Sequence, residues 1–106
     1  MEQEYYALII DIEAYQDIAT AKEWYESQQV GLGNRFVLGF DAAIQLLKTN
    51  PHIYQKAYEE YRRVLIKKFP YAIFYAIDEI EKEVEIIAVF HTNQNPENLE
   101  TKIKGR

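Results

Sequence analysis

The chain has 106 residues, a net charge of −5 at pH 7 and no cysteine. Its hydrophobic content of 48% is enough for a packed core and too high for a disordered chain. The length predicts one domain over residues 1–106, and the missing cysteines exclude disulfides and thiolate metal sites. No apolar run approaches the roughly 20 residues of a membrane helix, and no basic residue precedes the first apolar run, unlike in a secretory signal. We expect a soluble, cytoplasmic protein.

The first half of the chain predicts a strand followed by a helix. Residues 5–10 are apolar at both odd and even positions and are rich in strand-forming types, which indicates a strand over residues 4–11 that is buried on both faces. Asp11 then occupies the position of a helix N-cap. Apolar or long side chains recur at helical spacing through about residue 29, and they form a single stripe: Ala14, Ile18, Ala21, Tyr25 and Gln28.

A second helix follows a break at residues 31–34. A glycine can end the first helix, and Asn34 can cap the next one. The second helix should stop at Asn50-Pro51, because proline disfavours helical geometry in the residue before it. Its predicted buried face consists of Phe36, Phe40, Ala43, Ile44 and Leu47. The two helices should therefore form an antiparallel hairpin.

The second half predicts three strands and a polar tail. Residues 63–68, 71–78 and 84–91 are dominated by β-branched and aromatic types, and the acidic residues 79–83 indicate a hairpin loop. Residues 51–61 are ambiguous, and residues 92–106 form a polar C-terminal tail that is irregular or weakly helical. The fold class is α+β: an N-terminal strand, a helical hairpin and a three-stranded antiparallel meander, with the helices packed on one face of the sheet.

The sequence lacks the motifs of cofactor and metal chemistry. There is no Gly-rich phosphate loop and no nucleophile elbow. The only two histidines, His52 and His91, have none of the companions that a zinc site needs. We therefore expect no cofactor and no metal.

A basic cluster is the first candidate for chemistry. Arg62, Arg63, Lys67 and Lys68 straddle one predicted strand, so alternate residues point to opposite sheet faces. Arg63 and Lys67 would share one face, and Arg62 and Lys68 the other. The face away from the helices would then hold at least two cations able to bind phosphates. A solvated strand surface explains the same charges equally well.

Aromatic residues and one histidine supplement this cluster. His91 ends the last predicted strand, where it can act as general acid or base in RNA cleavage or serve as a hydrogen-bonded structural residue. Tyr71 and Tyr75 share one strand parity, and Tyr75 can lie beside His91 or pack in the core. Three further tyrosines recur at helical spacing, which indicates either a base-stacking platform or a packed turn of helix: Tyr54, Tyr58 and Tyr61.

Taken together, several segments resemble the RelE/ParE toxin superfamily over about residues 5–96. The matching segments are residues 14–17 and 24–26, 31–36, 50–51, 61–63, 67–71, 73–75, 87–91 and 95–96. The resemblance implies the toxin of a type II toxin–antitoxin, plasmid-stabilisation-like system, neutralised by a cognate antitoxin that wraps it. Antitoxin binding would give a hetero-oligomer, and a homodimer is the alternative assembly.

The resemblance implies two alternative targets. RelE-like members are endoribonucleases that cleave ribosome-bound mRNA, whereas ParE-like members poison DNA gyrase and need no catalytic residue. A third hypothesis is a non-toxic homologue that acts only as a protein-binding module. Two positions depart from the family pattern, because Gln94 replaces a frequent arginine and Leu99 a frequent tryptophan. The candidate catalytic residues are His91, Arg62, Lys67 and Tyr75, and the candidate binding residues are Arg63, Lys68, Tyr71 and Gln94.

Overall fold

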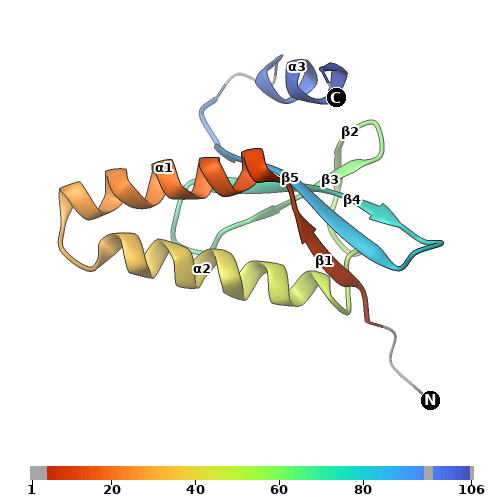
Figure 1. The fold of residues 1–106 in the computed structure, drawn as a ribbon, viewed down its shortest axis with the longest axis horizontal. Coiled ribbons are helices and arrows are strands. Elements are labelled where there is room, and N and C mark those ends of the chain that lie inside the picture. The colour runs from red at the N-terminus through yellow and green to blue at the C-terminus, as the bar shows by residue number, and fades with distance from the viewer. Residues whose placement is uncertain (1–4, 95–96, 106) are drawn as a thin grey trace.

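The computed structural model describes residues 5–94 and 97–105 of the chain. A short strand leads into two long helices, four further strands and a last helix (Figure 1). The elements are β1 (Ala7–Ile10), α1 (Ile12–Gln28), α2 (Leu32–Leu47), β2 (Lys56–Tyr58), β3 (Tyr61–Leu65), β4 (Tyr71–Asp78), β5 (Glu83–His91) and α3 (Glu97–Lys104). None of the helices in the described ranges is both long and apolar enough to cross a membrane.

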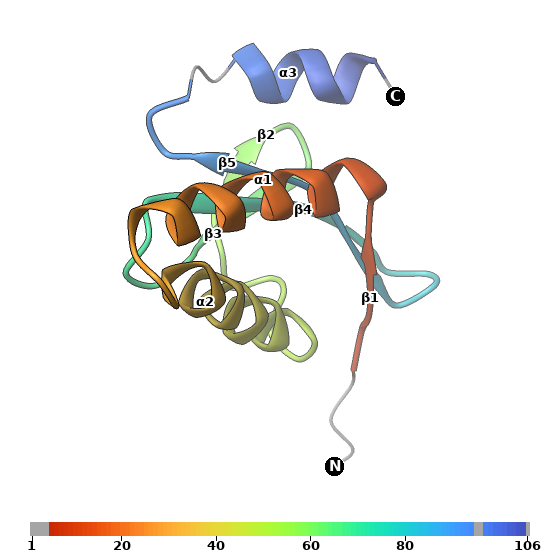
Figure 2. The same cartoon turned by 60° about the vertical axis from the view of Figure 1, so that its left-hand side comes forward.

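The five strands form one sheet in the order β1-β5-β4-β3-β2. The pairs β2–β3, β3–β4 and β4–β5 are antiparallel, and the pair β1–β5 is parallel. The α1–α2 hairpin lies on one side of the sheet and α3 on the other (Figure 2). The predicted α+β class and the antiparallel meander β3–β4–β5 are confirmed. β2 is an additional element, and α3 agrees with the helical alternative for the tail.

Both faces of the sheet centre are buried, because each face is covered by different helices. The larger core lies between the α1–α2 hairpin and the sheet, where Ile73 and Tyr75 of β4 are fully buried. The smaller core lies between the sheet and α3, where Ala72 and Phe74 of β4 pack with Leu99. Alternate residues of β4 therefore belong to opposite layers, as strand geometry requires.

The predicted helical faces are largely confirmed. In α1 the buried residues are Ala14, Ile18, Ala21 and Tyr25, whereas Gln28 is exposed because the helix ends there. In α2 the buried face is the predicted one with Gly33 added. Asp11 occupies the N-cap position of α1, although its side chain makes no capping hydrogen bond.

The turn between the helices differs from the prediction at Asn34. Gly31 adopts a left-handed conformation with φ of 89°, and α2 already begins at Leu32, so Asn34 lies inside the helix. Glu26 of α1 serves as the cap, because its carboxylate accepts hydrogen bonds from the N–H groups of Gly31 (2.9 Å) and Gly33 (3.0 Å). A carboxylate at a helix N-terminus satisfies unpaired N–H groups and the helix dipole.

The first strand is an edge strand and is not buried on both faces, contrary to the prediction. Tyr6, Leu8 and Ile10 pack toward the hairpin core, whereas Ala7 and Ile9 are exposed. The sequence pattern could not reveal this, because the apolar residues at odd positions face solvent at the end of the sheet. Residue 4 of the predicted strand lies outside the described residues.

The segment 51–68 also differs from its predictions. β3 ends at Leu65, and Lys67 and Lys68 lie in the turn before β4, where Lys68 has φ of 72°. The tyrosines at helical spacing are not on a helix, because Tyr58 and Tyr61 are cross-strand partners in the β2–β3 hairpin. Their spacing of three comes from the two-residue turn at 59–60, whose Glu59 has φ of 49°.

The hairpin packing yields a stability prediction at Gly33. A Cβ atom on Gly33 would lie 2.6 Å from the carbonyl oxygen of Lys22, so the two helices would have to separate. We expect Gly33→Ala to lower the free energy of unfolding by about 1–3 kcal/mol, a usual cost of overpacking. Asn34→Ala is the matched control, with an expected change below about 0.5 kcal/mol, because Asn34 is an exposed helix residue and not a cap. Urea denaturation measures both, and a larger loss for Asn34→Ala would contradict this description.

Candidate functional site

Arg62 lies on the hairpin side of the sheet and is engaged by the chain itself. It is the cross-strand partner of Tyr75, whose side chain belongs to the core beneath the α1–α2 hairpin. Its Nη1 donates hydrogen bonds to the carbonyl oxygens of His52 (3.2 Å) and Tyr54 (2.6 Å). Arg62 therefore holds the segment between α2 and β2.

Tyr75 holds the same segment from the core. Its side chain is fully buried, and its hydroxyl donates a 2.6 Å hydrogen bond to the carbonyl oxygen of Pro51. Burial raises the pKa of Tyr75 well above its usual value, so the hydroxyl keeps its proton. Such a group is poorly placed to touch a substrate, and its geometry is that of a structural hydrogen bond.

Arg63 faces the opposite side of the sheet from Arg62. It is the cross-strand partner of Phe74, which belongs to the core beneath α3. Arg63, His91 and Gln94 border a cavity of about 370 Å³ between the sheet and α3. The aromatic and apolar part of this lining comes from Tyr58, Phe74, Phe90 and Leu99.

His91 ends β5 in register with Tyr71, and the two rings pack edge to face with centroids 5.3 Å apart. Its Nδ1 accepts a 3.0 Å hydrogen bond from the backbone N–H of Asn93. The proton of the neutral ring therefore lies on Nε2, which can only donate. The Gln94 side chain accepts a hydrogen bond from the His91 N–H (2.8 Å), so it stabilises the turn after β5.

Tyr71 lies among aromatic rings on the hairpin side of the sheet. Its ring packs against Tyr25 and Phe36 of the two helices, with centroid separations of 6.0 and 5.1 Å. Burial raises the pKa of Tyr71. The ring therefore anchors the start of β4 against the two helices.

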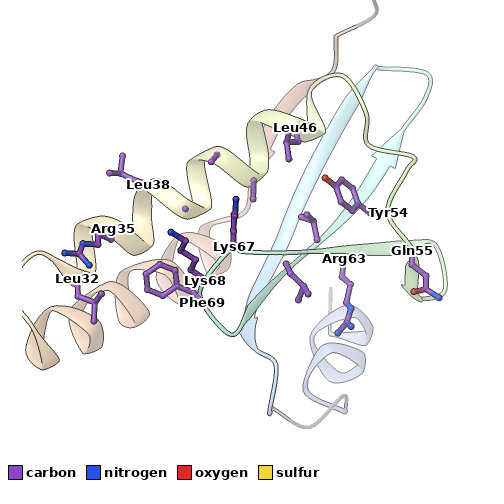
Figure 3. Close-up of a pocket in the computed structure, with 15 residues that line it drawn as sticks. Leu32, Arg35, Leu38, Leu46, Tyr54, Gln55, Arg63, Lys67, Lys68 and Phe69 are labelled. Atoms are coloured by element: carbon purple, nitrogen blue, oxygen red, sulfur yellow. The ribbon is translucent and has the colours of Figure 1, made fainter.

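Lys67 and Lys68 border a groove between α2 and β3 (Figure 3). The groove has a volume of about 950 Å³, and its α2 wall includes Leu38 and Leu46. Arg63 borders this groove from β3, but its side chain points away from α2 (Figure 3). The predicted sharing of one face by Arg63 and Lys67 is wrong, because the strand ends before Lys67.

The predicted site residues therefore do not share one surface. β3 and β5 do belong to one sheet, as expected, but β4 separates them. The structure brings Arg63, His91 and Gln94 to one cavity, and places Lys67 and Lys68 on a separate groove. Arg62 and Tyr75 hold the chain between α2 and β2. Within the described ranges, no group of three or more His, Asp or Glu is placed to hold a metal ion.

A polar cluster that the sequence analysis did not find joins the segment after α2 to the β4–β5 loop. His52 Nε2 pairs with the carboxylate of Glu79, Lys82 Nζ donates to it (3.1 Å), and the Tyr6 hydroxyl also donates to it (3.2 Å). Hydrogen bonding, first from Lys82 and then from Tyr6 and His52, lowers the pKa of Glu79. No periodicity reveals this cluster, since its members are far apart in the chain.

The Arg62–Tyr75 arrangement yields a prediction that distinguishes adjacent arginines. We expect Arg62→Ala and Tyr75→Phe each to lower the free energy of unfolding by about 1–3 kcal/mol, because buried or partly buried carbonyls lose their donors. Arg63→Ala should change it by less than about 0.5 kcal/mol, because Arg63 makes no such bond to any carbonyl of residues 5–94 or 97–105. Urea denaturation gives these values, and amide hydrogen exchange should accelerate in residues 52–55 only for the first two variants. Equal effects of the two arginine substitutions would refute the arrangement.

The Glu79 cluster predicts a pH dependence with a defined sign. The folded-state pKa of Glu79 is below its unfolded value, so its contribution to stability is present above the unfolded pKa and is lost as pH falls through the folded one. We expect Glu79→Gln to be less stable than wild type at pH 7, with the difference disappearing as the pH falls below about 4. Thermal unfolding from pH 7 to pH 3 measures this, and a difference that stays constant over that range would exclude it.

Comparisons with known proteins agree with the fold and the sequence resemblance. The family model described as the ParE toxin of type II toxin–antitoxin system, parDE, matches residues 8–96. No curated protein sequence matches the chain.

Three solved structures share the fold. The chromosomal ParDE toxin–antitoxin system from P. aeruginosa matches with a TM-score of 0.72 at 12% identity, covering 82% of this chain and 96% of that chain. The toxin–antitoxin complex RelBE2 from Mycobacterium tuberculosis gives 0.54 at 16% identity, with 82% and 98% covered. The isolated E. coli RelE toxin gives 0.55 at 15% identity, with 95% and 99% covered. Because the family model matches most of its length, the chain belongs to the ParE toxin family of type II toxin–antitoxin systems, within the RelE/ParE superfamily.

Proposed function

We propose that this chain is a toxin that inhibits growth by binding DNA gyrase in the cytoplasm, without catalysing phosphodiester cleavage. A cognate antitoxin neutralises it. One observation carries the choice of mechanism: the four candidate catalytic side chains are not assembled at one surface. Arg62 and Tyr75 are bonded to main-chain carbonyls, and Lys67 lies at the α2 groove, away from the cavity that His91 borders.

The requirements of RNA cleavage support the non-catalytic mechanism, because the described site does not meet them. Attack of a 2′-hydroxyl on its phosphodiester needs a proton acceptor and a cation that stabilises the transition state. His91 has its Nδ1 lone pair engaged by Asn93, so in this geometry the neutral ring has no acceptor nitrogen left. Gln94 supplies no charge where similar toxins often have arginine. A net charge of −5 also disfavours tight association with ribosomal RNA.

Structural relatives support the proposal of an antitoxin partner. Two of the similar folds were solved as part of a ParDE system and of a RelBE2 toxin–antitoxin complex. We extend that association to this chain as a proposal. The resulting assembly is a hetero-oligomer of toxin and antitoxin.

Ribosome-dependent mRNA cleavage is the second candidate, because Arg63 and His91 border the same cavity. There the doubly protonated His91 ring, which forms only when Nδ1 releases the Asn93 N–H, would donate its Nε2 proton to the leaving 5′-oxygen and become neutral, and Arg63 would contact the phosphate. Base activation would require His91 Nδ1 to release the Asn93 N–H.

Paired assays of the wild type and His91→Ala distinguish the candidates. We expect wild type and variant to inhibit gyrase supercoiling of relaxed plasmid within about twofold of each other, because no proton transfer is involved. Neither should cut mRNA on translating ribosomes. Cleavage by wild type that His91→Ala abolishes would overturn the gyrase proposal in favour of the nuclease. If wild type inhibits neither reaction and does not slow growth when induced, the chain is a non-toxic binding module.

A further inference from the structure

One end of the molecule presents large apolar side chains from three segments that are far apart in the sequence. This end consists of β1, the segment after α2 and the β4–β5 loop, and it lies away from the α1–α2 turn (Figure 1). Tyr5 is 65% exposed, Ile53 70% and Ile80 92%, and we call these three residues the apolar patch. Each directly adjoins a member of the Glu79 cluster in the chain: Tyr6, His52 and Glu79 itself. The contacts within that cluster therefore hold the three segments of the patch together.

The loop that carries Ile80 is held in place by its own side chains. Asp78 Oδ1 accepts hydrogen bonds from the N–H groups of Ile80 and Glu81, each 3.0 Å long. The carboxylate of Glu79 joins the same loop to β1 and to the segment after α2. A surface fixed in this way loses little conformational entropy when a partner binds, and covering its apolar side chains removes them from water. The patch is therefore a preformed docking surface.

The surroundings of the apolar patch are acidic. The connection between β4 and β5, residues 78–83, contains four acids and one base. Beside it lies a hollow of about 310 Å³, which is lined by Ile9, Ala76 and Ile77 and by three carboxylates: Asp78, Glu83 and Glu85. Across the part of the chain that the structure describes, no such group of acids is placed to hold a metal ion. An aliphatic hollow edged with carboxylates instead fits the stem and the charged head of an arginine or lysine side chain. The chemistry of this end therefore suits a basic protein surface.

We propose that the apolar patch and the acidic residues around it bind a basic surface of DNA gyrase. The choice of partner rests on the proposed function. An enzyme that acts on DNA carries basic surfaces, because it must bind phosphates. The acidic loop of the toxin complements such a surface in charge, and the three apolar side chains supply the centre of the contact. An arginine or lysine of gyrase occupies the hollow beside Ile9.

Two other occupants are disfavoured by the same charges. A nucleic acid would bring phosphates against carboxylates. A second copy of the chain would do the same with acids, because a twofold contact places the same patch of each copy against the other. The apolar patch is also distinct from the α2 groove and from the cavity beneath α3, since none of its three residues lines either of them. Substitutions in the patch therefore leave those two surfaces intact.

Binding of the purified full-length toxin to purified gyrase, measured by biolayer interferometry, tests the proposal. We expect Ile53→Ser/Ile80→Ser to weaken binding about tenfold or more, because the centre of the contact is lost. Glu81→Lys should weaken it about fivefold or more, and its binding should depend less steeply on salt than that of wild type.

Matched controls lie near the opposite end of the molecule. Val30→Ser repeats the apolar change at a position that is 89% exposed, and Glu23→Lys repeats the charge change on the exposed side of α1. Both should bind gyrase within about twofold of wild type. All of these positions are exposed, so thermal unfolding of each variant should match that of wild type.

The outcomes separate this surface from the proposed function. If wild type inhibits gyrase and the patch variants bind it as tightly as the controls, the patch assignment is overturned and the proposed function stands. The assignment is overturned in the same way if the patch variants lose only antitoxin binding, because the patch would then serve the antitoxin. If wild type slows growth without binding gyrase, the proposed function fails, and gyrase as the occupant of the patch fails with it. Loss of growth inhibition in the patch variants alone would in that case assign the patch to a different target.

Discussion

The fold depends on the alternation of side chains along the central strand β4, both of whose faces are buried. β3 pairs with it residue by residue, so the alternation of β4 also fixes the faces of β3. Arg62 opposite Tyr75 must point toward the helical hairpin, and Arg63 opposite Phe74 must point toward α3. A slip of one residue would move Ile73 and Tyr75 out of the main core. The burial of β4 therefore decides which charged side chains are available at each surface.

This constraint explains why a basic cluster in the sequence is not a basic surface in space. Arg62 and Arg63 are adjacent in the chain and lie on opposite faces of the sheet. Lys67 and Lys68 follow the end of β3 and turn toward α2. The side chains of Arg62 and Tyr75 donate hydrogen bonds to main-chain carbonyls and so order the segment after α2. Of the four cations, Arg62 is therefore used for structure, Arg63 borders the cavity beneath α3, and Lys67 and Lys68 lie at the α2 groove.

Helical periodicity predicted the buried faces of α1 and α2 well, because buried residues on a helix recur every three or four positions. The buried stripes of α1 and α2 and the loop at 79–83 followed from local patterns alone. Local patterns did not predict the end of β3, the edge position of β1 or the β2–β3 hairpin that contains Tyr58 and Tyr61. Each of these features depends on which strands pair. Tyr58 and Tyr61 show the difficulty: a two-residue hairpin turn gives the same spacing of three as a helix.

The candidate site was predictable in composition but not in arrangement. His91 was placed correctly at the end of the last strand, yet its bond with Asn93 depends on the turn that follows. No sequence pattern indicated the α2 groove. Leu38 and Leu46 lie outside the buried stripe of α2, and exposed leucines on a helix are not distinctive in a sequence. Cations from α2 and from the β3–β4 turn meet there through tertiary packing. Surfaces built from two elements of this kind are visible only once the sheet order is known.

Side-chain proton contacts of the two adjacent arginines test the central claim most directly. In NOE spectra of the folded protein, the Arg62 methylene protons should contact Tyr54 and Tyr75, and those of Arg63 should contact Phe74 and Leu99. Arg62 contacts with Leu99 or Ile103 would instead place both arginines beneath α3. In that case the separation of the candidate catalytic side chains, and the non-catalytic mechanism that rests on it, would be contradicted.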